Sequence, residues 1–240
     1  MSRQTTNSLY WQGVRDGAPF VLVVVPFAFL FGVVGTEAGL SLAETMGFSV
    51  LVIAGAAQFT ALQLLTDNAP ALIALASALA VNLRMAMYSA SLTPWMGAAP
   101  LWQRAFAAYF MVDQSYACAI VRFEQEPRLS VPERMAYYFG VVTPICPLWY
   151  AFTLAGALIG NAVPPGLPLD FALPITFLAM IGPMLRTPAH MAAAAVSVTL
   201  ALIFAGLPYN TGLLVAGVAG MMTGAQAEVM LERRKAARQP

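Results

Sequence analysis

The sequence predicts an all-α fold: a polytopic integral membrane helix bundle with about eight transmembrane helices, some of them possibly discontinuous. Of the 240 residues, 60% are hydrophobic and only 10% are charged, and the mean hydropathy is +0.73. A soluble domain carries about a quarter charged residues, so this composition indicates a membrane protein. The net charge of +1 offers no basic surface for nucleic acid.

The apolar runs define the expected helices. A spanning helix needs roughly 20 mostly apolar residues. The candidate spans are residues 18–36, 45–65, 70–92, 104–122, 136–160, 169–185, 188–206 and 210–230. A short polar segment (1–17) precedes them and a basic tail (232–240) follows, so we expect a single transmembrane domain over 1–240. Residues 169–206 are either two spans or one bent hairpin.

The positive charges predict the orientation of the chain. Cytoplasmic loops of membrane proteins carry an excess of Lys and Arg. With eight spans and both termini cytoplasmic, ten of the 12 Lys and Arg residues lie inside, Arg104 lies outside and Arg84 lies within a span. The ten are Arg3, Arg15, Arg122, Arg128, Arg134, Arg186, Arg233, Arg234, Lys235 and Arg238.

Two ionisable residues lie deep within predicted spans. Arg84 is in "AVNLRMAMYSAS", beside Asn82 and one turn before Tyr88, and Asp113 is in "YFMVDQSYACA". With a rise of about 1.5 Å per residue, Arg84 and Asp113 project to depths that differ by only about 4 Å, so the two can pair. Such a pair can simply neutralise two charges and join neighbouring helices. It can also serve function, which is favoured because buried ion pairs contribute little to stability and charged residues within membrane spans tend to be functional.

The stretch "AGAAQFTALQLL", residues 54–65, is unusual for a lipid-facing helix. Gly55 and its flanking alanines have almost no side-chain bulk, and Gln58 adds a hydrogen-bonding amide. One interpretation is a small-residue interface with one interhelical hydrogen bond. The other is a broken helix that lines a substrate cavity near the midplane. The stretch alone does not decide between them.

Glycines at four-residue spacing mark further helix contacts. Gly156 and Gly160 form one such pair, and Gly220 and Gly224 form another, one turn after Ala216. Both are expected to be packing seams, and the Ala216 face is a candidate docking surface for a second membrane subunit. The segments "PFAFLFGVVGTEAGL" and "PLWYAFTLAGALIGN" place proline, aromatic residues and glycines alike, which suggests an internal duplication.

No catalytic or metal-binding pattern is present in the sequence. Cys118 and Cys146 both lie in apolar segments, and there is no HExxH, GxSxG or Walker pattern and no His/Cys cluster. We therefore expect no enzyme activity, no cofactor and no metal site.

Three segments resemble the AzlC-like family, the large subunit of bacterial branched-chain amino acid exporters. They are "LVIAGAAQFTALQLL", "VNLRMAMYSASLTP" and "DQSYA", in this order and about thirty residues apart, and the segment "LDFALPITFLAMIGPMLR" also fits. The resemblance covers nearly the whole chain. The sequence departs from the family at Met85, where a histidine often follows the arginine of "NLR".

The resemblance implies a permease in the bacterial cytoplasmic (inner) membrane that exports branched-chain or similar neutral amino acids with a small AzlD-like membrane subunit. Proton coupling is our further expectation. An amino acid needs a partner for its carboxylate, a partner for its ammonium group and an apolar pocket. The candidate substrate-binding residues are Gln58, Asn82, Arg84, Gly55 and Tyr88, and the candidate proton-coupling residue is Asp113. The alternative function is a non-transporting membrane scaffold or assembly subunit.

Overall fold

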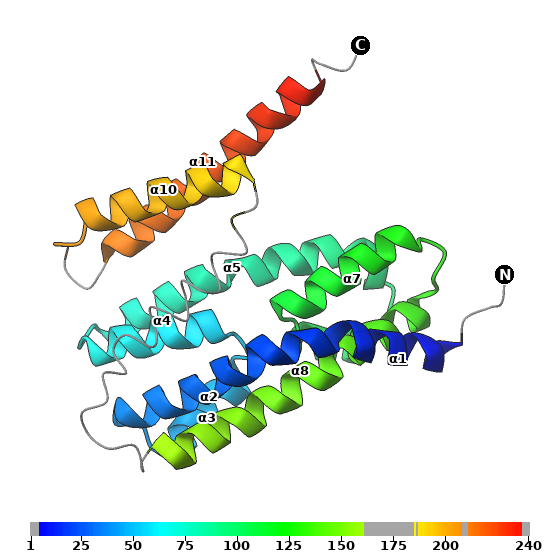
Figure 1. The fold of residues 1–240 in the computed structure, drawn as a ribbon, viewed down its shortest axis with the longest axis horizontal. Coiled ribbons are helices and arrows are strands. Elements are labelled where there is room, and N and C mark those ends of the chain that lie inside the picture. The colour runs from blue at the N-terminus through cyan, green and yellow to red at the C-terminus, as the bar shows by residue number, and fades with distance from the viewer. Residues whose placement is uncertain (1–4, 161–184, 186, 208–210, 237–240) are drawn as a thin grey trace. The chain divides into compact units, whose positions relative to one another are not determined.

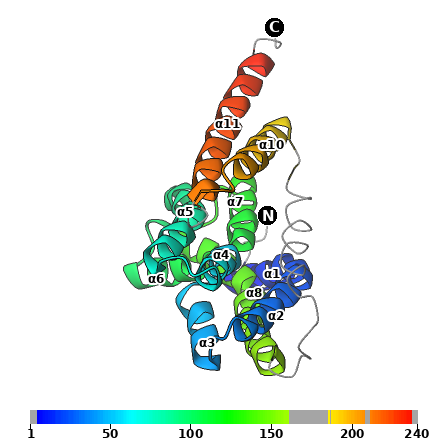
Figure 2. The same cartoon turned by 90° about the vertical axis from the view of Figure 1, so that its left-hand side faces the viewer.

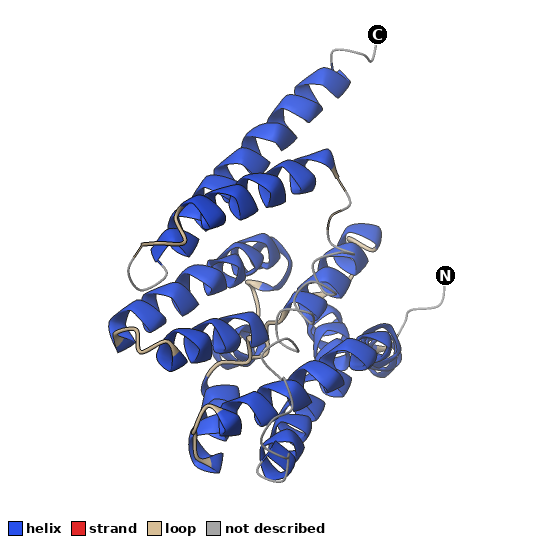
Figure 3. Ribbon diagram, turned by 60° about the vertical axis from the view of Figure 1, so that its left-hand side comes forward, coloured by secondary structure: helices blue, strands red, loops and turns tan. Residues whose placement is uncertain are grey.

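The computed structural model describes residues 5–160, 185, 187–207 and 211–236. The described residues form helices joined by loops and contain no strand, which confirms the all-α prediction (Figure 3). The chain divides into two compact units, residues 1–62 with 78–167, and residues 63–77 with 168–240. The single domain over 1–240 stays a prediction. The predicted span 169–185 lies outside the described residues except for Leu185.

The first unit is built on two long helical segments that run side by side in the same direction. Helix α1 (Thr6–Gly17), the 3₁₀ turn η1 (Ala18–Phe20) and α2 (Val21–Glu37) are continuous, and they lie along α8 (Val131–Gly160) (Figure 1). The polar segment that precedes the first predicted span is therefore mostly helical. Both long segments exceed the length and hydropathy needed to cross a membrane.

Glycines bring these two segments into backbone contact. A Cβ atom built on Gly32 would lie 2.6 Å from the backbone nitrogen of Ala157, and one built on Gly140 would lie 3.1 Å from the Cα atom of Gly13. Gly156 faces the backbone of Phe29 in the same way. The contacts advance together along both helices, so the packing is parallel. Gly156 and Gly160 thus belong to a packing seam, as predicted, and parallel segments are also what an internal duplication would give.

The predicted span 45–65 is not one helix. It forms α3 (Leu42–Leu51) and α4 (Gly55–Thr66), which point in different directions (Figure 2). A capping box between Ser41 and Glu44 starts α3, and α3 ends at Val52, which has the extended conformation φ −138°, ψ 97°. The β-branched Val52 and Ile53 fit an extended break, because branching at Cβ lowers helix propensity.

The predicted span 104–122 is also broken. Its residues fall in α6 (Leu101–Tyr109) and α7 (Asp113–Gln125), with Val112 extended at φ −129°, ψ 164°. Between the two broken segments runs α5 (Ala71–Met96), which is long and apolar enough to cross a membrane. The prediction of a bundle that includes discontinuous helices is thus confirmed. The prediction of a continuous span 104–122 was wrong, because no proline or glycine marks the break before Asp113.

The second unit contains α10 (Pro188–Ile203) packed on α11 (Thr211–Ala236). Ser197 donates a hydrogen bond to the carbonyl oxygen of Ala216, and a Cβ atom on Gly224 would lie 3.1 Å from the Cβ atom of Ala193. Ala216 is only 2% exposed. The face formed by Ala216, Gly220 and Gly224 is thus occupied by α10, so the prediction that it docks a second subunit was wrong.

Candidate functional site

The predicted pair of intramembrane charges is present. Arg84 Nη2 of α5 lies 3.1 Å from Asp113 Oδ2 of α7, and the two side chains are 27% and 39% exposed in the isolated chain. Tyr88, one turn after Arg84, donates a hydrogen bond to the other carboxylate oxygen of Asp113, at 3.0 Å. Both oxygens of Asp113 therefore have partners on one face of α5.

Aromatic residues extend this contact between α5 and α7. The rings of Tyr88 and Tyr116 stack with their centroids 4.0 Å apart and their planes 8° from parallel. The hydroxyl of Tyr116 is hydrogen-bonded to the hydroxyl of Ser91 at 3.1 Å. The two helices therefore meet through the ends of long side chains. We refer to Arg84, Tyr88, Asp113 and Tyr116 as the α5–α7 cluster.

The helix break sets the position of Asp113. Asp113 is the first residue of α7, where a carboxylate is favoured because free N–H groups and the helix dipole make the N-terminus positive. The buried Ser115 accepts a hydrogen bond from the N–H of Val112 at 3.0 Å and donates to the hydroxyl of Tyr138 at 3.3 Å. Tyr138 in turn donates to the carbonyl oxygen of Ala107 in α6, at 2.8 Å. One buried tyrosine of α8 thus bonds to both sides of the break.

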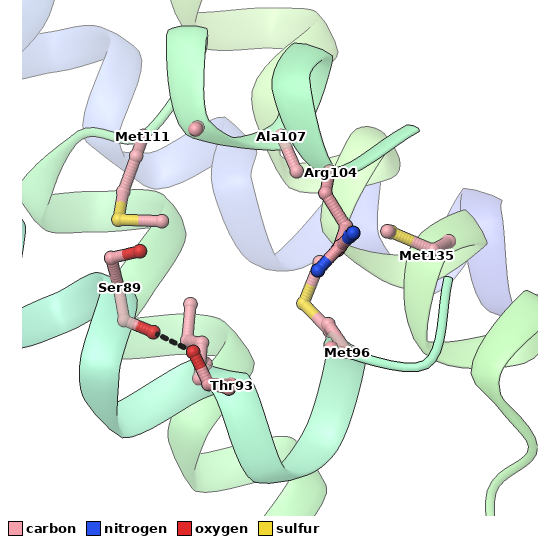
Figure 4. Close-up of a pocket in the computed structure, with 10 residues that line it drawn as sticks. Ser89, Thr93, Met96, Arg104, Ala107, Met111 and Met135 are labelled. Carbon is pink, nitrogen blue, oxygen red and sulfur yellow. Dashed lines mark hydrogen bonds between the residues drawn. The ribbon is translucent and has the colours of Figure 1, made fainter. Parts of the chain in front are cut away.

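A small cavity with mostly apolar walls is lined by sequence neighbours of the α5–α7 cluster, although no residue of the cluster itself lines it. It has a volume of about 70 Å³, and its lining includes Ser89, the residue after Tyr88, and Met111, two residues before Asp113. Met96, Met111 and Met135 line it from different sides (Figure 4). Methionine side chains are flexible and fill irregular space, so such a cavity can adapt to a small apolar group.

Gln58 and Gly55 lie in a different environment from Arg84. The amide nitrogen of Gln58 donates to Ser49 Oγ at 3.2 Å, and Gln58 is 1% exposed. Gly55 packs so closely on aromatic side chains that a Cβ atom would lie 2.8 Å from the ring of Trp149. These contacts place Gln58 in a separate polar cluster, so the predicted pairing of Arg84 with Asp113 is present but Gln58 does not bond to either residue.

Asn82 is not bonded to the α5–α7 cluster. Its side-chain oxygen is buried and has no hydrogen-bond partner within the described residues, and the same holds for Arg84 Nε. In a membrane-spanning helix such atoms are costly unless water, lipid headgroups or a ligand reach them. Asn82 therefore remains a candidate substrate-binding residue only because of its position two residues before Arg84.

A third feature, which the sequence did not reveal, lies between α1, α7 and α8. Tyr137 donates a hydrogen bond to Asp16 Oδ2 at 2.7 Å, and the Arg122 guanidinium lies over the Tyr137 ring, 5.7 Å from its centroid. These side chains line a cavity of about 460 Å³ together with apolar residues such as Phe20 and Val121. Arg122 is also paired with Glu126 at 3.2 Å. No spacing in the sequence links residues 16, 122 and 137, so only the fold could show this arrangement.

Long apolar helices, two helix breaks and an ion pair at one of them define a polytopic membrane protein of the architecture found in transporters. The chain belongs to a known family of this class. Residues 19–163 match the family model described as AzlC protein, so the chain is a member of the AzlC family, as the sequence motifs indicated. Membership supports a role related to membrane transport and is consistent with a protein that is not an enzyme.

Two curated relatives agree with this assignment. The chain is 26% identical over 186 residues to Inner membrane protein YgaZ of Escherichia coli (strain K12), covering 73% of each chain. It is 27% identical over 229 residues to an uncharacterized membrane protein of Archaeoglobus fulgidus, covering 92% of this chain and 96% of the relative. No solved structure matches the chain.

Proposed function

We propose that this protein is a secondary transporter that exports branched-chain or similar neutral amino acids, coupled to the proton gradient, together with a small AzlD-like membrane subunit. The observation that carries the proposal is the Arg84–Asp113 ion pair at the start of α7. A cation and a carboxylate held within spanning segments are costly unless function retains them. Family membership supports the transport role.

The cluster offers the two charges that an amino acid requires. In the proposed mechanism, the substrate carboxylate takes the place of Asp113 at the Arg84 guanidinium, because guanidinium groups bind carboxylates with two parallel hydrogen bonds. Asp113 is then free to accept the substrate ammonium group or a proton. Tyr88 remains a hydrogen-bond donor to whichever carboxylate lies there.

The methionine-lined cavity supports the expected substrate class. A volume of about 70 Å³ lined by Met96, Met111 and Met135, with Arg104 at one side, suits a short branched side chain better than a long one. Asn82, two residues before Arg84 on α5, has a buried side-chain oxygen without a partner in the described residues and supplies a further polar group. In this proposal Gln58 and Gly55 lie outside the pocket, although the prediction that they bind substrate is untested.

The second candidate function is a non-transporting scaffold subunit. It is favoured by one observation: Arg84 and Tyr88 already satisfy both oxygens of Asp113, as a purely structural pair would. The two candidates differ in what happens when the charges are removed, because a scaffold needs them only for assembly.

The test is leucine efflux from proteoliposomes that contain the chain and its small subunit, with and without a pH gradient. We expect Asp113→Asn to insert and assemble but to lose the pH dependence of efflux. We expect Arg84→Ala to lose efflux more severely, since it removes the carboxylate partner and leaves Asp113 with Tyr88 alone. Arg128→Ala and Asp67→Asn, both exposed loop positions, are matched controls that should export normally.

Normal, pH-dependent efflux by both cluster variants would contradict the proposal and favour the scaffold. No leucine efflux by the wild-type pair of subunits would also contradict it. Omitting the small subunit tests the partner: unchanged efflux from the large subunit alone would show that the partner is not required.

A further inference from the structure

We propose that the break between α3 and α4 is a binding site for a monovalent cation of the size of Na⁺, held by the side chains of Ser49, Gln58 and Thr153. The inference does not rest on the proposed export function, because a cation site can exist in a transporter of any substrate or in a scaffold. It goes beyond the sequence analysis, which predicted no metal site.

The three side chains form a connected and fully buried set. Gln58 Nε2 donates to Ser49 Oγ at 3.2 Å, and Ser49 Oγ donates to Thr153 Oγ1 at 3.2 Å. Ser49 and Thr153 are 0% exposed and Gln58 is 1% exposed. They come from three elements, since Ser49 lies in the last turn of α3, Gln58 in the second turn of α4 and Thr153 on α8.

Two buried side-chain oxygen atoms on α3 and α4 have no hydrogen-bond partner among the described residues. Gln58 Oε1 is buried and has no hydrogen-bond partner, and the same is true of Thr45 Oγ1, one turn before Ser49 on α3. A network that only joins helices would be expected to satisfy its buried acceptors, because a buried polar group without a partner costs free energy. Gln58 Oε1 can only accept, so this unpartnered atom within the set points to a ligand that takes up its electron pairs.

The spacing of the oxygens fits a cation of this size. Ser49 Oγ and Thr153 Oγ1 lie 3.2 Å apart. A cation about 2.4 Å from both would have them at an angle of about 84°, close to the right angle of octahedral coordination. In this arrangement Gln58 keeps its hydrogen bond from Nε2 to Ser49 Oγ, and its unpartnered Oε1 supplies the third ligand.

The backbone at the break can supply further ligands. The last four carbonyl groups of a helix have no partner within it. In α3, the carbonyl of Phe48 accepts from the N–H of Val52 at 3.0 Å and that of Val50 accepts from the Tyr109 hydroxyl at 2.6 Å. The carbonyls of Ser49 and Leu51 are the other two. The C-terminal end of a half-helix is also the negative end of its dipole, which favours a cation.

The chemistry of the set selects a monovalent cation. Hydroxyl, amide and carbonyl oxygens are hard, neutral ligands, and none of the three side chains bonds to a charged group in the described part of the chain. A divalent ion buried without carboxylates would lose more hydration energy than neutral oxygens return. The nearby wall is aromatic, since Phe27 and Phe59 pack edge to face at 4.9 Å and Phe27 lies 6.0 Å from Trp149. Aromatic faces attract cations and exclude water.

The test uses the purified full chain with its small subunit in lipid nanodiscs. Binding of radioactive ²²Na⁺ is measured by equilibrium dialysis, with unlabelled NaCl, KCl and choline chloride as competitors at constant ionic strength. We expect saturable binding of one ion per chain, displaced by NaCl but not by choline chloride. Ser49→Ala and Thr153→Val should each weaken binding by at least about tenfold, the effect expected from losing one direct ligand of a charged group.

Two further variants separate ligand loss from misfolding. Gln58→Glu keeps the shape of the side chain and places a negative charge at the unused oxygen, so we expect tighter Na⁺ binding, by about tenfold or more. Ser197→Ala is the matched control: it removes an interhelical hydroxyl bond of α10, outside the set, and should bind Na⁺ as the wild type does.

The inference is overturned if no saturable Na⁺ binding is found, or if Ser49→Ala and Gln58→Glu bind as the wild type does. Its failure is distinguishable from that of the proposed export function, because leucine efflux is measured separately. Efflux without any Na⁺ binding would leave the export proposal standing and this site refuted.

Discussion

Replacing Gly32 by alanine tests the parallel packing of α1–α2 on α8. A Cβ atom at residue 32 would lie 2.6 Å from the backbone nitrogen of Ala157 and 2.9 Å from the carbonyl carbon of Gly156. Ordinary van der Waals contact begins at 3.4 Å, so the helices must separate locally by at least 0.8 Å, the difference between 3.4 Å and 2.6 Å. The opposing atoms are backbone atoms, which cannot turn away as a side chain can.

The magnitude follows from known costs of overpacking, about 1–3 kcal/mol per site. Alanine also raises helix propensity over glycine, by about 0.8–1.0 kcal/mol, and this gain must be subtracted by a matched control. Gly47→Ala supplies it, since no heavy atom of a neighbouring residue lies within 4 Å of a Cβ there. With about 2–4 °C per kcal/mol for a chain of this length, Gly32→Ala should melt about 2–12 °C below Gly47→Ala.

The assay is thermal unfolding of the chain in nanodiscs, followed by circular dichroism. Gly140→Ala, at the other end of the same seam, should give a shift of the same sign. Its effect should add to that of Gly32→Ala, because Gly140 and Ala157, the residue of α8 that faces Gly32, lie about 26 Å apart along α8. If Gly32→Ala melts at or above the temperature of Gly47→Ala, the close backbone contact is refuted.

Three further predictions concern the charges and the second unit. A cysteine placed at Lys235 should react with an impermeant thiol reagent only in permeabilised cells, since both termini are predicted to be cytoplasmic, and labelling in intact cells would contradict this. Tyr88→Phe should lower leucine efflux by up to about tenfold, the loss of one hydrogen bond to a charged group, whereas unchanged efflux would exclude Tyr88 from the site. Gly220→Leu should lower the melting temperature of the large subunit alone, because Gly220 packs on Ser197 and Ala193 of α10. If the variant melts as the wild type does but no longer copurifies with the small subunit, the face of Ala216 docks that subunit after all.

Much of the first unit was predictable because its signals are local. The apolar runs predicted the long helices, and the spacing of Gly156 and Gly160 predicted a close helix contact on α8. The Arg84–Asp113 pair followed from depth along two neighbouring segments, although Asp113 begins α7 and does not lie within the continuous helix that the estimate assumed. Tyr88 was found for the same reason, since it lies one turn from Arg84.

The breaks and the contacts made through them were not predictable in this way. The extended backbone at Val112 follows no proline or glycine, and the bonds of Tyr138 to Ser115 and Ala107 join residues that are far apart in the sequence. Gln58 was identified as unusual, but its partners Ser49 and Thr153 are ordinary residues in apolar segments. The face of Ala216 was misassigned because glycine spacing predicts a close contact without saying which helix makes it.

The two kinds of helix contact in the first unit differ in stiffness. The seam between α1–α2 and α8 packs backbone against backbone at its glycines, and these contacts hold the two segments together alongside the hydrogen bond from Tyr137 to the carboxylate of Asp16. Helix α5 meets α7 through the tips of Arg84 and Tyr88, and long side chains can keep a bond while their helices shift by several ångström. Spin-label distances across the two contacts, with and without leucine, would measure this contrast. We therefore expect the seam to keep its geometry and any rearrangement of this unit to occur at the contact between α5 and α7.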